Sequence, residues 1–228
     1  MADFARYLPL SQRPRGDERE VTSDRRAPTA TVLRAIAAAL RVGGERGWDA
    51  STDAGPTVAL ATAQLVAGFD RPPTRRALDT AQRALGMDAR QTPSVTPVEG
   101  AADAAAALEV RAARITERPQ PTRVVELDDA VVAAVIIGDA LGAPIVVPPL
   151  ASGAVALRRA AAAPTPIRAV ISGHSLHATD AGWTIGHGPV LVGTAHELIR
   201  FLAGIGSQPP RPPRDGELGD AERPDGTT

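Results

Sequence analysis

The chain has 228 residues, a formal net charge of −1 and no cysteine. The near-zero charge excludes a global attraction to nucleic acid or anionic lipid, so we expect neither a nucleic-acid nor a membrane partner. Without thiols, a disulfide framework, a thiolate metal site and a cysteine nucleophile are excluded. No stretch has the apolar core of a signal peptide or approaches the roughly 20 apolar residues of a membrane span, which predicts a cytoplasmic protein.

Residues 1–27 are polar and aperiodic, which predicts a mobile N-terminal arm. A first amphipathic helix is predicted from Pro28 to Gly43-Gly44, because its large apolar residues recur at helical spacing. Those residues are Val32, Leu33, Ile36 and Leu40. Further helices are predicted between the Gly-Pro at 55–56 and the Pro-Pro at 72–73, over 74–85, and over the alanine-rich stretch 101–118, with a proline-rich loop over 88–98.

The stretch 122–149 is ambiguous, because its valines suit a buried strand as well as a buried helix. From Arg123 to Leu141 there is no proline and one glycine, which favours one long buried helix. The alternative places Val131–Ile137 and Ile145–Val147 as neighbouring parallel strands of an α/β fragment. With this helix, residues from about 28 to 142 are predicted to form a helical bundle, and we assign residues 28–145 to the bundle domain.

The last part of the chain predicts a small unit over residues 146–206. A helix from Ala151 to Ala162 precedes four short strands at 167–172, 174–179, 183–186 and 190–192, expected to form an antiparallel sheet with Trp183 in its core. Helical spacing resumes at Thr194 and predicts a closing amphipathic helix. Residues 207–228 are rich in proline, glycine and charge, which predicts a disordered tail.

Several short patterns carry a resemblance to a known family. Arg123-Val124-Val125-Glu126 enters the last bundle helix, Leu141-Gly142-Ala143-Pro144 leaves it, and the chain closes with a Trp-centred strand, a Gly-Pro turn and a Leu-Ala-Gly at 202–204. In these features the sequence resembles the mycothiol-dependent maleylpyruvate isomerase family of actinobacterial proteins. The resemblance implies an α+β fold: a DinB-like bundle of four or five helices followed by a small antiparallel sheet with a closing helix.

The resemblance also implies a divalent metal, held in the bundle by three histidines, that activates the thiol of mycothiol. Here the first histidine is His174, so none of the three ligands carries over. The positions that correspond to the ligand-bearing motif of the last bundle helix fall among Ala130 to Ala134. We therefore expect a degenerate member with no metal site and no cofactor.

The acidic residues near this helix are the remaining candidate ligands or catalytic groups. They are Glu126, Asp128, Asp129 and Asp139. Asp128 and Asp129 fall near the start of the predicted helix, where acids favour the macrodipole and stay solvated. The four histidines are interpreted as surface or strand residues: His174, His177, His187 and His196. His174 and His177 are three residues apart on predicted strands, so their side chains point to opposite faces and are poorly placed to share a metal.

One further motif suggests a different enzyme class. Gly173-His174-Ser175-Leu176 resembles the start of the nucleophile elbow of α/β-hydrolases. The elbow needs a second glycine, where this chain has His177, and a helix directly after the serine, where a strand is predicted. An esterase of that class is therefore a remote alternative.

These patterns lead to a first hypothesis and a rival. The first is a binding or regulatory scaffold that has lost metal-dependent thiol chemistry, as a monomer or homodimer, with a small polar ligand as its candidate partner. The rival is a mycothiol-dependent or rebuilt-site enzyme, an isomerase or thiol transferase, whose weak catalytic candidates are Arg123, Glu126 and Asp129. An open polar pocket inside the bundle would favour the enzyme, and an apolar interior would favour the scaffold.

Overall fold

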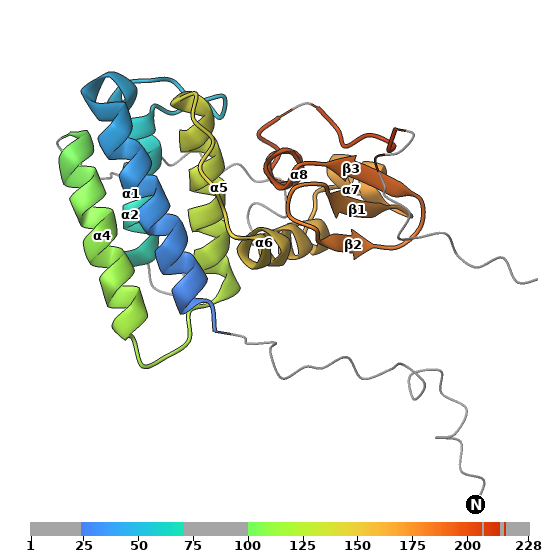
Figure 1. The fold of residues 1–228 in the computed structure, drawn as a ribbon, viewed down its shortest axis with the longest axis horizontal. Helices are drawn as coiled ribbons and strands as arrows, with labels where there is room; N and C mark the ends of the chain where they lie inside the picture. Colours follow the sequence, from blue (N-terminus) through green and yellow to red (C-terminus); the bar gives the residue numbers. More distant parts are fainter. Residues whose placement is uncertain (1–23, 71–99, 207, 215–216, 218–228) are drawn as a thin grey trace, which may run out of the picture.

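A computed structural model describes residues 24–70, 100–206, 208–214 and 217 (Figure 1). It begins with a bundle of α1 (Arg26–Trp48), α2 (Val58–Asp70), α4 (Ala101–Glu117) and α5 (Val124–Ala140). We call the remainder the C-terminal unit: α6 (Pro149–Ala161), α7 (Thr165–Ile171), β1 (Ser175–Ala178), β2 (Thr184–Gly186), β3 (Val190–Gly193) and α8 (Ala195–Leu202). The predicted α+β class, a helical bundle followed by a small sheet with a closing helix, is confirmed. The predicted helix over 74–85, the loop over 88–98 and residues 1–23 of the arm predicted over 1–27 lie outside the described residues. At the end of that arm, Arg26 and Ala27 already belong to α1.

The bundle is built around α1, α4 and α5. α1 and α4 pack along their lengths, and α5 packs against α1 and α2. The apolar face predicted for the first helix is buried, with Leu33 and Ile36 fully inaccessible to solvent. α4 contributes Leu108 and Ile115, also fully buried, and the small alanines between them let the two helices approach closely.

α1 continues to Trp48, beyond the end predicted at Gly43-Gly44. At Gly44 the backbone leaves the helical conformation (φ 54°, ψ −159°), so two helical segments meet there at a kink and the predicted stop is a real break within α1. Gly47 lies against α5's end, where a Cβ atom would come within 2.4 Å of Leu141 Cδ2. Gly47 therefore serves close packing between two helix ends, whereas Gly44, with nothing near its Cβ position, serves the break in the helix.

The ambiguous stretch is a single helix, α5, and the parallel-strand alternative for Val131–Ile137 is wrong. The helix is surrounded by α1, α2, α6 and α8, so apolar residues occupy most of its circumference. Leu127, Val131 and Ile137 are all completely buried. A helix enclosed in this way has no polar face to reveal its period, which explains the ambiguity. Figure 1 shows α5 standing between the other bundle helices and the C-terminal unit.

The sheet of the C-terminal unit has the order β2-β1-β3 and is mixed. β1 pairs antiparallel with β2, with Leu176 opposite Ile185, and parallel with β3, with Leu176 opposite Leu191. The prediction of an antiparallel sheet is therefore wrong for β1 and β3. After the β1–β2 hairpin the chain reverses again, so β3 runs in the same direction as β1. Because β3 then pairs with the free edge of β1 and not with β2, this pair is parallel.

The strand predicted for Ile167–Ser172 is also wrong, because these residues lie mostly in α7. Pro164 occupies the N-cap position, and Pro166 lies in the first turn. Proline is favoured there because its fixed φ suits a helix start and its missing N–H is not needed. The alternation of Ile167, Ala169 and Ile171 imitates a strand, but the two prolines decide the local structure.

The predicted start of the closing helix at Thr194 is confirmed by a complete capping box. The Thr194 hydroxyl accepts from Glu197 N (3.2 Å), and the Glu197 carboxylate accepts from Thr194 N (2.8 Å). Asp180 Oδ1 accepts a further bond from Ala195 N at 2.6 Å. This end of α8 is thereby fixed beside the β1–β2 hairpin.

Residues 208–214, which we call the edge segment, differ from the disorder predicted for residues 207–228. Arg211 forms an antiparallel bridge with Val192 of β3. The composition of this segment lacks apolar anchors, but a main-chain pairing needs none, which is why composition alone does not reveal it.

Two clusters of buried apolar residues lie on either side of α6 and α8. The larger fills the bundle and includes Val155 of α6 and Ile199 of α8, while the smaller fills the C-terminal unit around Leu176, Leu198 and Leu202.

In the described ranges, no helix combines the length and the apolar character that crossing a membrane requires.

Trp183 is half-buried and packs on α6, so its predicted role in the core is met from one side only. Its ring lies over Gly153, and its Nε1–H donates to Ser152 Oγ at 3.0 Å. We expect Trp183→Ala to lower the free energy of unfolding by about 2 kcal/mol, below the range for a fully buried aromatic. Trp183→Phe keeps the ring and should cost about 1 kcal/mol in urea unfolding. Equal losses for the two variants would contradict this packing.

Candidate functional site at the seam of the bundle and the C-terminal unit

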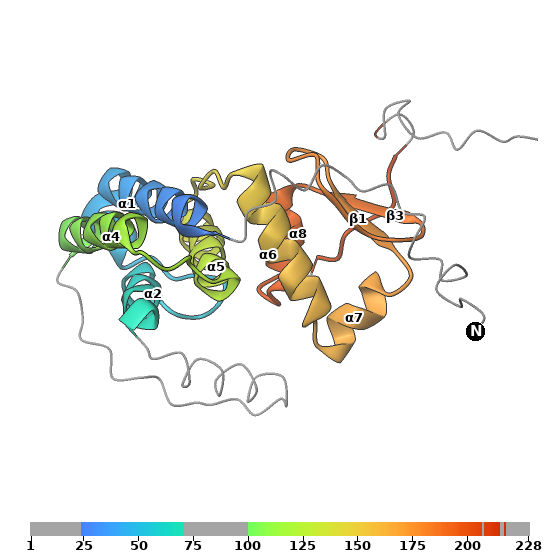
Figure 2. The same ribbon diagram turned by 90° about the horizontal axis from the view of Figure 1, so that it is seen from below.

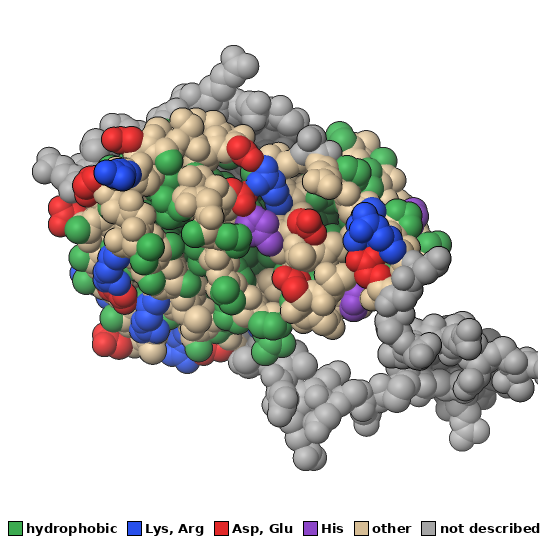
Figure 3. All heavy atoms as spheres, turned by 45° about the horizontal axis from the view of Figure 1, so that its top comes forward, with side chains coloured by type: hydrophobic (Ala, Val, Ile, Leu, Met, Phe, Trp, Pro, Cys, Tyr) green, Lys and Arg blue, Asp and Glu red, His purple; other side chains and the backbone are tan. Residues whose placement is uncertain are grey.

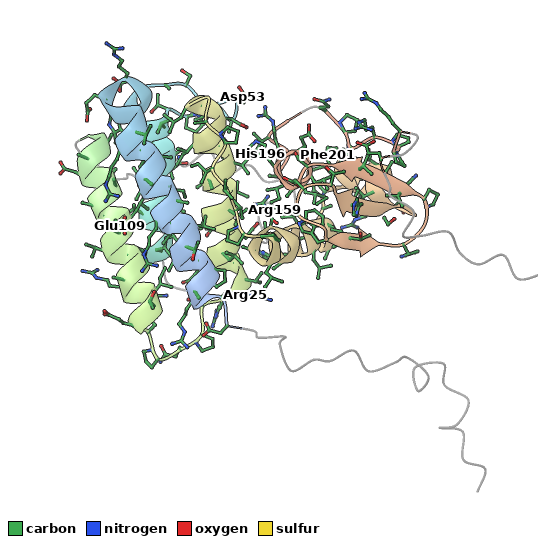
Figure 4. The ribbon with its side chains drawn as sticks, viewed as in Figure 1. Arg25, Asp53, Glu109, Arg159, His196 and Phe201 are labelled. Atoms are coloured by element: carbon green, nitrogen blue, oxygen red, sulfur yellow. The ribbon has the colours of Figure 1, made fainter. Side chains whose placement is uncertain are left out.

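α6 and α8 of the C-terminal unit pack on α5, and we call this contact the seam (Figure 2). Charged side chains from both sides pair across it. Its charged residues are Asp53, Asp128, Asp139, Arg158, Arg159, His196 and Arg200. About 11 residues make three turns of an α-helix, so Asp128 and Asp139 lie on one face of α5, roughly 16 Å apart. Figure 4 shows Asp53, His196 and Arg159 between the bundle and the C-terminal unit.

At one end of the seam, two arginines enclose Asp128. Arg159 donates through Nε to Oδ1 at 2.5 Å and through Nη2 to Oδ2 at 3.2 Å, a bidentate pair. Arg158 Nε adds a bond to Oδ2 at 3.4 Å. The Asp128 side chain is 7% exposed and those of the arginines 18% and 24%, so the pair is largely desolvated. The interpretation of Asp128 as a solvated helix-start residue is wrong.

The other end joins three separate elements. Asp139, in the last turn of α5, accepts from His196 Nε2 at 2.8 Å through Oδ1 and from Arg200 Nη1 through Oδ2. Arg200 also donates through Nη2 to Asp53, in the loop between α1 and α2. Figure 3 shows acidic, basic and histidine side chains gathered over the line between the two halves of the molecule. His196 is therefore a contact between units, which corrects its interpretation as a surface residue.

The electrostatics of this end are satisfied internally. The hydrogen bond with Asp53, and then the charges of Asp139 and Asp53, raise the pKa of the Arg200 guanidinium above its ordinary value. Arg200 therefore stays charged at every pH at which the protein folds, and two carboxylates neutralise it. An imidazole held by a carboxylate is the arrangement of a general base. Here Arg200 shares the same carboxylate, so the cluster is built to hold α8 against α5 and the 50–57 loop.

The structure does not bring the three catalytic candidates named from the sequence into this seam. Arg123 is exposed at the N-cap position of α5. Glu126 receives Arg118 Nη1 on both carboxylate oxygens at 3.3 Å and so ties α5 to the end of α4. Asp129 is half-buried one position after Asp128, turned by about 100° around the helix axis.

His174, His177 and the serine of the elbow-like motif have local structural partners. His177 Nδ1 lies 2.9 Å from Thr184 Oγ1, across the β1–β2 pair, and His174 Nδ1 lies 3.1 Å from Ser172 O. The Ser175 hydroxyl donates to Gly188 O at 3.0 Å. Ser175 begins β1 rather than a strand-to-helix turn, so the geometry that exposes a hydrolase nucleophile is not built here.

The family resemblance implies a metal in the bundle, and the described residues do not fit one. The segment 130–134 of α5 reads Ala-Val-Val-Ala-Ala and contributes no ligand atom, with Ala130, Val131 and Ala134 fully buried. Within the described ranges no cluster of three or more histidine, cysteine or acidic side chains could hold a metal ion. Buried polar side chains of the described bundle helices are Thr29, Thr62 and the arginine-bound Asp128. No catalytic step through a metal is derived for this interior.

Sequence reasoning missed the arginines of α6 and the pairing of His196 with Asp139. The available signal is weak: Arg158-Arg159 in the last turn of a helix is also what the helix dipole alone would favour. The partners lie 30 and 57 residues apart along the chain, so only the packing of α6 and α8 on α5 brings them together.

Comparison of the chain with protein-family models, curated proteins and solved structures found no match.

Proposed function

We propose that this chain is a cytoplasmic binding or regulatory scaffold, related to the mycothiol-dependent maleylpyruvate isomerases, that has lost metal-dependent thiol chemistry. The order of the elements, a helical bundle followed by a small sheet with a closing helix, is what the resemblance implies and so supports the relationship. The proposal concerns the described part of the bundle and the C-terminal unit that packs on it.

One observation carries the loss of the chemistry. The face of α5 that would present metal ligands to the bundle interior is made of small buried apolar residues, Ala130, Val131 and Ala134. Alanine and valine supply no ligand atom, and because these residues are fully buried, neighbouring side chains occupy the space beside them that a metal and its thiol would need. This face of α5 stabilises the fold and offers no polar group to a substrate.

The seam supports the scaffold for a second reason. Each arginine and histidine of the seam binds a carboxylate of α5. These four residues are Arg158, Arg159, His196 and Arg200. None of these four is left over to hold an anionic substrate. The charge in this contact instead fixes how the C-terminal unit sits on the bundle, as a scaffold requires.

The test is the metal content of the purified chain after dialysis, combined with its thermal midpoint in added zinc, nickel and manganese. We expect less than 0.1 equivalent of each metal, as an order of magnitude for adventitious binding, and no shift in midpoint. A ligand at one hundred times its dissociation constant would stabilise the native state by about 2.7 kcal/mol, which such a measurement detects readily.

Matched variants identify any site that is found. Glu126→Gln and Asp129→Asn remove the two carboxylates of the rival hypothesis without changing side-chain shape. About one equivalent of retained metal, lost in either variant, would contradict the scaffold and support an enzyme with a rebuilt carboxylate site.

A further inference from the structure

The outer edge of β3 is covered by the edge segment through a single rung of main-chain bonds. Val192 N donates to Arg211 O at 2.7 Å, and Arg211 N donates to Val192 O at 3.3 Å. On the other side of β3, the carbonyls of Pro189 and Gly193 accept from β1 and the residue after it, Ser175 and Thr179. Main-chain groups alternate between the two edges of a strand, so Val190 and Val192 present theirs outward.

Proline prevents this pairing from extending. With Arg211 opposite Val192, the next rung on an antiparallel ladder places residue 213 opposite Val190. Residue 213 is proline and has no N–H to donate. In the other direction, the amide of Thr194 is already used by the capping box of α8. The edge segment therefore binds β3 by one rung and leaves the carbonyl of Val190 without a ladder donor from residue 213.

The surface next to this rung carries an acidic group that suits a basic peptide. Glu197 of α8 lines a pocket of about 110 Å³, whose other wall, including Pro209 and Arg211, belongs to the edge segment itself. Its acidic member faces Arg211: the bond to Glu217 first, and then the charges of Glu217 and Glu197, raise the pKa of the Arg211 guanidinium. Arg200 on the same rim is already neutralised by Asp53 and Asp139.

We infer that the outer edge of β3 is a docking site for an extended peptide of another protein, which adds to the sheet as a strand and displaces the edge segment. The peptide has a basic residue opposite Val192, near Glu197, and a residue other than proline opposite Val190. The edge segment is then a built-in occupant that shields the strand edge while binding it weakly enough to be displaced.

A second copy of this chain is not the expected occupant. Its edge segment carries the same Pro213 and would form the same single rung, so an exchange between copies gains no hydrogen bond. The segment also starts close to its own site, because Ile205, six residues before Arg211, packs against the bundle core. A peptide that supplies the missing N–H gains one main-chain bond, which corresponds to roughly three- to ten-fold in affinity.

This inference rests on the proposed binding function but concerns β3 and not the bundle interior. Its experiment uses the full chain with Arg211→Pro, which removes the edge segment's own N–H from the rung and the guanidinium that binds Glu217, and so weakens the hold of the edge segment on β3. The probe is a fluorescent peptide with the sequence of residues 207–216 and Pro213→Val. The control peptide carries Pro212→Val instead, whose new N–H points away from β3 because successive residues alternate.

We expect the Pro213→Val peptide to bind the Arg211→Pro chain several-fold more tightly than the control peptide does, and more tightly than it binds the unaltered chain. Arg211→Glu in the peptide should weaken binding about ten-fold or more, since it faces Glu197. Amide resonances of Val190 and Val192 should shift on binding. A full chain with Pro213→Val should bind its own segment more firmly and resist the peptide.

Equal binding of the two peptides, or shifts that map away from β3, would overturn the inference. Self-association of the Arg211→Pro chain without peptide would also overturn it, by making a second copy the occupant. The metal measurement above is unaffected by either result, so failure of the peptide site and failure of the proposed loss of metal chemistry can be told apart.

Discussion

Ile199→Ala should lower the free energy of unfolding by about 3 kcal/mol and leave unfolding a single transition. Ile199 is 1% exposed and belongs to the core of the bundle, although it lies on α8 of the C-terminal unit. Its neighbours Leu198 and Leu202 fill the other core. Because one short helix supplies both cores, we expect the loss at position 199 to be felt throughout the molecule.

The two tryptophans make this measurable in urea. Trp48 reports on the bundle and Trp183 on the C-terminal unit, so Trp48→Phe and Trp183→Phe each leave one probe. The control is Leu157→Ala on α6, whose residue is 58% exposed and which should change stability by less than about 0.5 kcal/mol. Separate midpoints for the two probes would show that the bundle and the C-terminal unit unfold independently and would contradict the shared core.

The sequence predicts those elements whose signals are local. The buried face of α1 follows from apolar residues at helical spacing, and the start of α8 follows from Thr194 and Glu197, three residues apart. α5 could be predicted from the absence of proline, although its enclosed position removed the usual amphipathic pattern. In each of these cases neighbours along the chain carry the information.

The errors fall where local signals conflict or where partners are distant. The alternating apolar residues of α7 favour a strand, whereas Pro164 and Pro166 favour a helix start, and the prolines decide the structure. Whether β3 pairs parallel with β1 or antiparallel with β2 depends on the edge of the hairpin that it joins, which no residue within the strand determines. Asp128 looks like an ordinary helix-start acid until α6 packs beside it. The candidate site is therefore only partly predictable: the sequence points to Asp128 and Asp139, but not to Asp53 or to the arginine and histidine partners.

Asp128→Ala should lower the free energy of unfolding by about 3 kcal/mol, the second large effect we expect. The carboxylate is 7% exposed and binds Arg159 through two nitrogen atoms and Arg158 through one. Its removal leaves two partly buried guanidinium groups without their neutralising charge, and this penalty exceeds the net stabilisation that the intact pair provides. Urea unfolding at neutral pH gives the free energy directly.

Two further variants separate a buried ion pair from a loss of negative charge in general. Asp53→Ala removes the same charge from a side chain that is 62% exposed, and should cost about 1 kcal/mol or less. Asp128→Leu combined with Arg159→Met replaces the bidentate pair by apolar groups and should recover at least half of the loss, because fewer charges remain orphaned. If Asp128→Ala costs no more than Asp53→Ala, the arginines of α6 turn to solvent without penalty. The seam would then not depend on this pair for the position of the C-terminal unit on the bundle.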